Sequence, residues 1–141
     1  MEADYLMLAD SAQVVGEKLY LLGGGWTMLN APQLPFSLPI GIAVGINVEW
    51  METNRRHSFK LELRHEDDGG QVLVSVEGEF EAGRPPGIPA GMVQKVQMAF
   101  NVTPKFERPG PYVAQLMLDN QSARRQPFNV VGTSAPSASA P

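Results

Sequence analysis

Hydrophobic and polar residues alternate along most of this 141-residue chain with the period of two that is typical of β-strands. The pattern is clearest in residues 108–131. Four apolar residues share one face of its first extended part: Tyr112, Ala114, Leu116 and Leu118. The other face carries Val113, Gln115 and Met117. Because Asp, Asn and Ser side chains bond to their own backbone and favour turns, residues 119–122 predict a hairpin turn, after which a second strand returns.

The same period predicts further strands before this hairpin. They are expected at residues 3–9, 18–22, 40–50, 57–66, 71–81 and 92–103. For residues 1–14 a short amphipathic helix is the alternative, because Leu, Met and Ala favour helices. Residues 67–70 (Asp-Asp-Gly-Gly) predict a tight hairpin, since Asp-Gly supplies the positive φ angles of a type I′ turn.

Two stretches within this pattern are rich in small residues. The glycines at 23–25 are interpreted as a bulge or a sheet crossover, because no Lys-Ser/Thr pair or helix follows them as a phosphate-binding loop requires. In the strand at 40–50, large β-branched residues occupy one face, and the other carries Gly41, Ala43 and Gly45. The large face is expected to point to the core. The small face could admit another surface or carry a covering loop.

Seven or eight short strands, with turn signals about every 8–12 residues and no convincing helix, predict an all-β protein. The expected architecture is an antiparallel β-sandwich of the immunoglobulin-like type, and a barrel is the alternative. Residues 1–131 are predicted to form one domain. Residues 132–141 consist mostly of Ser, Ala and Pro without an apolar period, and are predicted to be a disordered tail.

Several segments carry a family resemblance when they are taken in order. EADYLMLADSAQ at the start, then KLYLLGGGW, a Pro-rich loop, a glycine-spaced strand ending in Trp50, and ETNRRH leading into FKLELRHEDDGG resemble a family of small bacterial proteins of unknown function, frequent in actinobacteria. The resemblance covers about residues 2–131 and implies a bacterial single-domain protein without an assigned catalytic residue. The segment 108–131 also resembles the last strands of immunoglobulin-like sandwich domains.

Composition narrows the possible partners and compartments. A net charge of −4 and a pI near 5.1 argue against binding to nucleic acid or anionic lipid, because both require a basic surface. The absence of cysteine excludes disulfides, a thiolate nucleophile and a cysteine zinc site. The first residues show no signal-peptide pattern and no stretch reaches the length of a membrane helix, so a cytoplasmic protein without membrane contact is expected.

The densest polar cluster lies between two predicted strands. Its members are Glu52, Asn54, Arg55, Arg56 and His57. One hypothesis is a binding site for an anionic group, in which the two arginines donate paired hydrogen bonds. The alternative is a solvated loop whose arginines pair with Glu49 and Glu52. If a second arginine pair at 124–125 fell at the same end, an acidic partner would be favoured.

Metal binding has little support in the sequence, and no cofactor is predicted. His57 and His65 are the only histidines, and about 26 Å separates them on one predicted strand, so they cannot share a metal. Both are expected at the solvent-exposed ends of that strand. Carboxylates at 66–68, together with Asp119 and Asn120, suggest a calcium site, but no EF-hand spacing is present and turn chemistry fully explains both segments.

No arrangement of residues typical of a catalytic site is visible, so the protein is predicted not to be an enzyme. The preferred hypothesis is a protein-interaction or self-assembly module. It rests on the small face of strand 40–50 and on Val113 and Met117, which are expected to be exposed. The alternative is a small-ligand or calcium-binding sandwich that uses the polar loops 52–57 and 66–68.

Overall fold

The computed structural model describes residues 1–67 and 70–132. These residues form eleven β-strands and one 3-10 helix, η1 (Trp50–Glu52), so the protein is all-β as predicted. Eight strands have at least seven residues, which matches the expected number, and the other three have two to four. Within the described ranges, no helix has the length and apolar character needed to cross a membrane.

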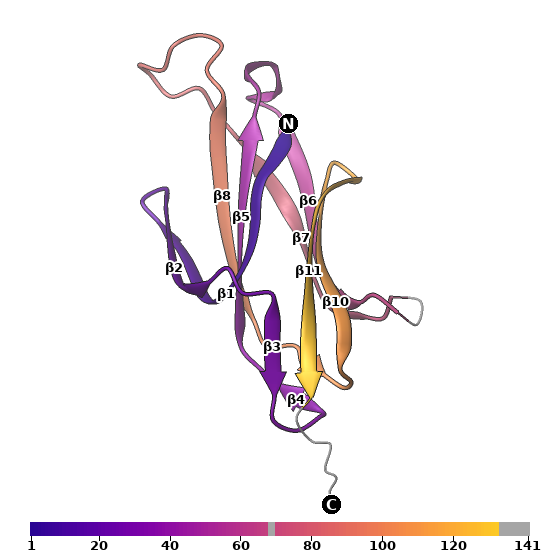
Figure 1. Ribbon diagram of the computed structural model, residues 1–141. Coiled ribbons are helices and arrows are strands. Elements are labelled where there is room, and N and C mark those ends of the chain that lie inside the picture. The colour runs from indigo at the N-terminus through magenta and orange to yellow at the C-terminus, as the bar shows by residue number, and fades with distance from the viewer. Residues whose placement is uncertain (68–69, 133–141) are drawn as a thin grey trace, which may run out of the picture.

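The strands form two large sheets that lie face to face as elongated layers (Figure 1). The first sheet has the order β2 (Lys18–Gly24), β1 (Glu2–Val15), β5 (Ile40–Val48) and β8 (Gln94–Val102). The second has the order β3 (Met28–Ala31), β11 (Gln121–Gly132), β10 (Gly110–Leu118), β6 (Arg56–His65) and β7 (Val72–Glu81). A small third sheet joins β4 (Phe36–Ser37) to β9 (Lys105–Phe106).

Neighbouring strands in these sheets run antiparallel with one exception. β3 pairs in parallel with the end of β11, from Asn129 opposite Met28 to Gly132 opposite Ala31. The predicted fully antiparallel arrangement is therefore wrong at this one edge. Gly132 closes β11, so the predicted tail does not begin there, and its remaining residues lie outside the described part of the chain.

The core lies between the two large sheets and is built from the faces that the alternation indicated. Fully buried core side chains come from both layers: Ile42, Val44 and Ile46 from β5, Leu61 and Leu63 from β6, and Tyr112 and Leu116 from β10. Each such side chain contributes roughly 1.5–3 kcal/mol through burial. Near one end, the rings of Phe106 and Tyr112 pack edge to face at 5.2 Å, and Phe128 stacks on Tyr112 at 5.6 Å.

Two predictions about exposure in the second sheet were wrong. Val113 was expected on the exposed face, but it is fully buried between its neighbours Arg64 and Pro127 in the sheet. His57 and His65 were expected at exposed ends, and both are buried. The period of two itself places both histidines on the same face as the core leucines of β6, so burial follows from their parity.

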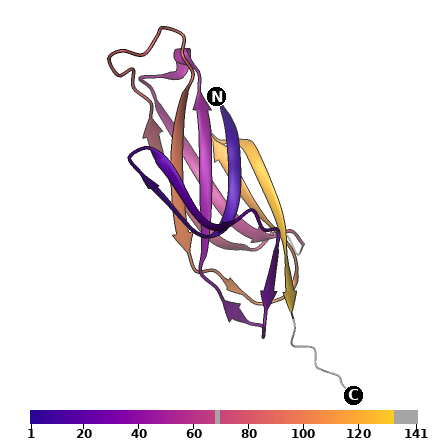
Figure 2. The same ribbon diagram turned by 60° about the vertical axis from the view of Figure 1, so that its left-hand side comes forward.

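β1 continues through the predicted break at residues 10–13, and no helix forms there. Its first half pairs with β5, from Glu2 opposite Asn47 to Ala9 opposite Gly41. Its second half pairs with β2, across a two-residue turn at Gly16 and Glu17. Both turn residues have positive φ angles, 57° and 64°, as a type I′ turn requires. The resulting β1–β2 hairpin (residues 9–24) projects from the outer side of the first sheet (Figure 2).

The chain covers its own small-residue face. A Cβ atom added at Gly41 would lie 2.7 Å from the backbone nitrogen of Ala12, so β1 crosses directly over this glycine. At Gly45 an added Cβ would collide with the ring of Tyr5. The glycines of β5 therefore permit close approach by β1, and this face is not free for a partner.

Candidate functional site

His57, from the predicted polar cluster, lies inside the fold. Its Nδ1 is 2.8 Å from Asp119 Oδ2, and its Nε2 is 2.8 Å from the backbone oxygen of Glu52. Both partners are acceptors, so only the doubly protonated ring donates to both. Burial by itself lowers the pKa of His57, but the hydrogen bonds to Glu52 and Asp119 and the charges of both residues raise it above its ordinary value. His57 thus links η1 to the β10–β11 turn.

Asp119 completes this link from the other side. It has a positive φ angle of 49° in the turn, and its Oδ1 accepts the backbone N–H of Ser58 at 2.9 Å. That hydrogen bond, assisted by His57 against the opposing effect of burial, lowers the pKa of Asp119. The cluster of Glu52, His57 and Asp119 therefore acts as a structural anchor within the fold.

The remaining members of the predicted cluster do not converge on one point. Asn54 has a positive φ angle of 58°, and its backbone N–H donates to Ala82 at 2.7 Å. Arg56 extends sideways, with Nε 3.6 Å from Glu79 Oε1 on β7. Arg55 is exposed. The five residues thus lie on η1, on the connection after it and at the start of β6, and the contacts of His57, Asn54 and Arg56 lead to different partners. The proposed anion site stays a prediction.

The second arginine pair is divided between different contacts. Arg124 Nη1 donates to the backbone oxygens of Ala3 and Asp4, both at 3.2 Å, and so closes the side of the sandwich between β11 and β1. Arg125 forms an ion pair with Glu66. The sequence analysis did not single out Arg84, whose guanidinium lies 4.0 Å above the Trp50 ring, with Nε donating to Thr53 Oγ1 at 2.6 Å.

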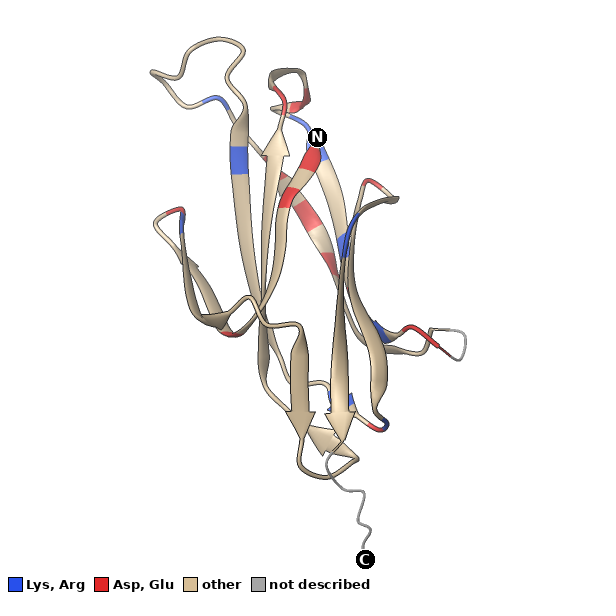
Figure 3. Ribbon diagram, viewed as in Figure 1, with Lys and Arg blue, Asp and Glu red and all other residues tan. Residues whose placement is uncertain are grey.

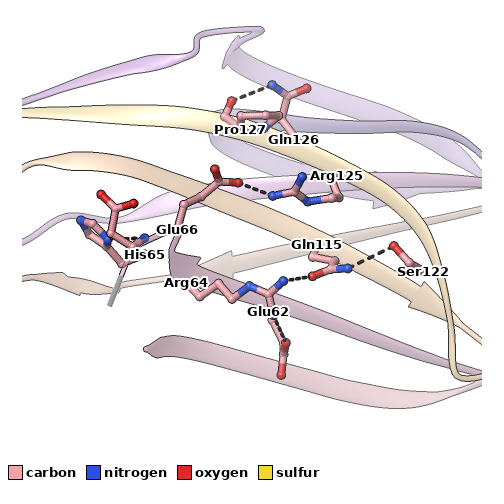
Figure 4. A network of polar contacts seen from close by, with 10 residues as sticks. Glu62, Arg64, His65, Glu66, Gln115, Ser122, Arg125, Gln126 and Pro127 are labelled. Carbon is pink, nitrogen blue, oxygen red and sulfur yellow. Dashed lines mark hydrogen bonds and ion pairs between the residues drawn. The ribbon is translucent and has the colours of Figure 1, made fainter. Parts of the chain in front are cut away.

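The outer side of the second sheet carries a polar network (Figure 4). Arg64 contacts both Glu62 and Gln115, and Gln115 Nε2 donates to Ser122 Oγ at 3.1 Å. The charged and amide groups of this network are therefore paired with one another by ion pairs and hydrogen bonds. This face is therefore a solvated, self-paired surface, and each such exposed pair contributes about 0–1 kcal/mol.

The two segments proposed to share calcium lie at opposite ends of β6. Asp119 contacts Ser58 near the start of this strand, and Glu66 follows its last residue. Asp68 lies outside the described residues. In residues 1–67 and 70–132, no three His, Cys, Asp or Glu side chains come together as metal ligands. Glu66 and Asp67 therefore cannot hold one ion together with Asp119.

The most distinctive exposed feature is the β1–β2 hairpin. It carries three large apolar side chains in contact with solvent: Val15, 52% exposed, Tyr20, 54%, and Leu22, 71%. β2 is the last strand of its sheet, so its outer edge has no partner strand within the described chain. Long apolar edge strands are unusual in isolated proteins, because their free backbone groups recruit other strands.

At the other end of the first sheet, β8 carries none of the largely exposed apolar side chains. The terminal strands of the second sheet are shielded in other ways. β7, at one end of the second sheet, has three acidic residues in alternating positions, Glu77, Glu79 and Glu81, which Figure 3 shows as red bands. β3, at the other end, has only four residues and is followed by Pro32. Charge, shortness and proline are the usual means by which proteins block edge pairing. β2 has none of them beyond Lys18 at its first position.

Specific contacts hold the hairpin in place. The Asn101 side chain accepts the N–H of Ala12 at 3.1 Å and donates to the Ala12 oxygen at 2.8 Å, as the backbone of a neighbouring strand would. At the tip, Gln97 Nε2 donates to the Glu17 oxygen at 2.8 Å. β2 is therefore presented as a positioned strand. In the sequence, the apolar residues on both faces of KLYLL were the signal for this edge.

Comparison with solved structures finds only weak similarity. The chain is 12% identical to a β-glucosidase from Listeria innocua, with a TM-score of 0.42, covering 76% of this chain and 15% of that one. It is 9% identical to the alkylpurine DNA glycosylase AlkC from Pseudomonas fluorescens, with a TM-score of 0.46, covering 74% of this chain and 27% of that one. It is 15% identical to a β-glucosidase from Erythrobacter marinus, with a TM-score of 0.37, covering 72% of this chain and 14% of that one. No curated protein matches the sequence.

These comparisons contradict the prediction that the protein is not an enzyme, because the similar structures come from enzymes. The chain spans about a quarter or less of their length. With TM-scores below 0.5, they assign no reaction to this chain.

The sequence itself shows a family relationship. Residues 4–131 match the family of unknown function DUF6941, and this range includes every described strand in full or in large part. It also covers nearly the same residues as the resemblance noted in the sequence. The chain therefore belongs to DUF6941, a family of unknown function.

Proposed function

We propose that this protein is a protein-interaction module with an immunoglobulin-like sandwich, and that the β1–β2 hairpin is its binding element. The observation that carries the proposal is the exposed Tyr20 and Leu22 on the edge strand β2, since the terminal strands of the second sheet are short or acidic and β8 carries no largely exposed apolar side chain. The bacterial origin and the cytoplasmic location expected from the sequence stay predictions.

The strand order supports the immunoglobulin-like part of the proposal. β1, β5 and β8 face β11, β10, β6 and β7, which corresponds to strands A, B and E facing G, F, C and C′. Tyr112, near the start of β10, donates its hydroxyl to the Arg108 oxygen at 2.7 Å, four residues upstream. A tyrosine in this position with this hydrogen bond is a recurrent feature of immunoglobulin-like sandwiches.

The energetics of exposure support the binding part. Fully burying a side chain of this size contributes about 1.5–3 kcal/mol, and at Tyr20 and Leu22 more than half of that remains unrealised in the isolated chain. A partner that covers the hairpin would bury these side chains, and the free energy of that burial would then stabilise the complex. The sequence analysis based a protein-interaction role on the small face of β5 and on Val113, but both are buried. The exposed hairpin now supports that role in their place.

Site-specific photo-crosslinking in cells that produce the protein tests this proposal. A benzophenone side chain replaces Tyr20 in one variant and Ser75, an exposed residue on β7, in the control. We expect protein adducts from position 20 and few from position 75, because only the hairpin contacts a partner. Absence of adducts at position 20, or equal adducts at both positions, would refute the proposed function.

A further inference from the structure

The free backbone groups of β2 can be assigned from the hairpin geometry. Val15 and Lys18 flank the two-residue turn, so they form its hydrogen-bonded closing pair, and such pairs alternate with non-hydrogen-bonded pairs along the hairpin. Ala12 and Leu21 are therefore a non-hydrogen-bonded pair. The contacts of Ala12 agree, since its N–H and C=O bond to the Asn101 side chain on the far side.

It follows that Leu21 and Leu19 direct their N–H and C=O groups away from β1, toward the outer edge of β2. Four backbone groups are thus presented to a partner strand at regular spacing. The side-chain sequence between them is symmetric, because Tyr20 stands at the centre with one leucine on each side. Both the hydrogen-bonding pattern and the side chains of β2 are self-complementary.

We propose that β2 pairs with β2 of a second copy of this chain, antiparallel, around a twofold axis at Tyr20. In this register Leu19 faces Leu21 of the second copy, and the reverse pair follows by symmetry. All four outward backbone groups on each copy are then hydrogen-bonded. Shifting the register by two residues centres the axis on a leucine and leaves part of these groups unpaired.

The exposed side chains fit the same register. Tyr20 faces its symmetry mate in a non-hydrogen-bonded pair, where side chains are closest and aromatic pairs stabilise sheets. Leu22 faces Lys18 of the second copy, whose methylene chain covers apolar surface while its ammonium group remains in water. The first sheets of the two copies then join through their hairpins into one continuous sheet.

This inference rests on the proposed role of the hairpin and adds the identity of the partner. A second copy is the favoured occupant because it offers the same four groups at the same spacing without any rearrangement. The acidic edge of β7 is a poor alternative for self-pairing, since Glu79 and its neighbours would meet like charges. With few side chains involved, the contact is smaller than a standard interface, so association at micromolar concentration is expected.

Disulfide trapping tests the register directly, because the chain contains no cysteine. In Y20C the two introduced cysteines face each other with Cα atoms about 4.5 Å apart, which is within the range for a disulfide. In L22C the equivalent Cα atoms are about 13 Å apart, beyond that range. Because Leu22 is more exposed than Tyr20, random collision would favour L22C, whereas the proposed pairing favours Y20C. M51C is the control for an exposed cysteine outside β2, because Met51 lies on η1 and is 73% exposed.

We expect Y20C to form covalent dimers at least about tenfold faster than L22C and M51C under mild oxidation. Sedimentation velocity on the cysteine-free chain should show a monomer–dimer equilibrium. Y20K should weaken it about tenfold or more, by placing two like charges opposite each other, and M51K should leave it unchanged.

A strictly monomeric protein at high micromolar concentration, or L22C dimers that form as fast as Y20C dimers, would overturn the pairing. If position 20 still captures other proteins by photo-crosslinking, only the second copy is excluded and the proposed function stands. If position 20 captures no protein at all, both the pairing with a second copy and the proposed function are refuted.

Discussion

The contact between His57 and Asp119 makes a prediction about stability and pH. In D119N, the side-chain oxygen that accepts the Ser58 N–H is retained, and an amide donor replaces the oxygen that faces His57. Asn also tolerates the positive φ angle of this turn position. A neutral His57 then accepts from the amide at Nδ1 and donates to the Glu52 oxygen from Nε2. The substitution therefore removes the reason for His57 to carry a charge.

The pH window follows from the two pKa directions. The pKa of His57 is raised in the folded state, so its stabilising contribution is complete below the unfolded value of about 6.5 and is lost as the pH rises through the folded value. The pKa of Asp119 is lowered, so its contribution is present above about 3.9 and is lost as the pH falls through its folded value. Between these limits the contact is fully formed.

The magnitude can be estimated from the geometry. A buried hydrogen bond to a charged group contributes about 1.5–3 kcal/mol. The Asp119 side chain is 46% exposed, so solvent screening reduces this to about 1 kcal/mol. We therefore expect D119N to lower the free energy of unfolding by about 1 kcal/mol near pH 5.5, or the Tm by about 3 °C. The difference should shrink above the folded pKa of His57, because the wild type loses the charge there.

Urea unfolding at a series of pH values measures this difference, and NMR titration of the imidazole protons reports the pKa of His57. The D119N protein serves as the comparison in the titration, because it lacks the carboxylate that contacts His57. A His57 pKa at or below 6.5, or a D119N difference that is constant from pH 5 to 9, would refute the argument.

Three further substitutions test how the fold is held. G41A should destabilise the protein by about 1–3 kcal/mol, measured by urea unfolding, because its Cβ would meet the Ala12 backbone; stability equal to wild type would contradict the close crossing. N101A should accelerate amide hydrogen exchange in the hairpin while leaving β10 unaffected, because the two hydrogen bonds to Ala12 are lost; equal acceleration in both regions would argue against a local anchor. Y112F should lower the Tm by about 3–4 °C in a thermal scan, because the hydrogen bond to the Arg108 oxygen contributes about 1 kcal/mol, and an unchanged Tm would show that it does not.

Much of the fold could be predicted because alternation is a local property of the chain. Leu61 and Leu63 on β6, like Leu116 and Leu118 on β10, are buried as their parity indicated. Successive side chains of an extended strand point to opposite sides whatever the strand's neighbours are. The polar stretch at residues 52–57 does connect β5 to β6, but Arg56 and His57 already belong to β6, and the contacts of the cluster lead to different partners.

The sequence by itself determined most of the long strands and their core-facing sides, because these depend on neighbouring residues, but it did not show that β1 continues through residues 10–13. The tertiary structure alone decided which residues cover the outer faces of the sheets and which edge strand exposes apolar side chains to solvent. Val113 follows the same alternation as its neighbours but is buried, and Gly41 lies under β1 rather than under a partner. Such outcomes depend on contacts between residues far apart in the chain, such as Asn101 with Ala12 and His57 with Asp119, and no local pattern encodes them.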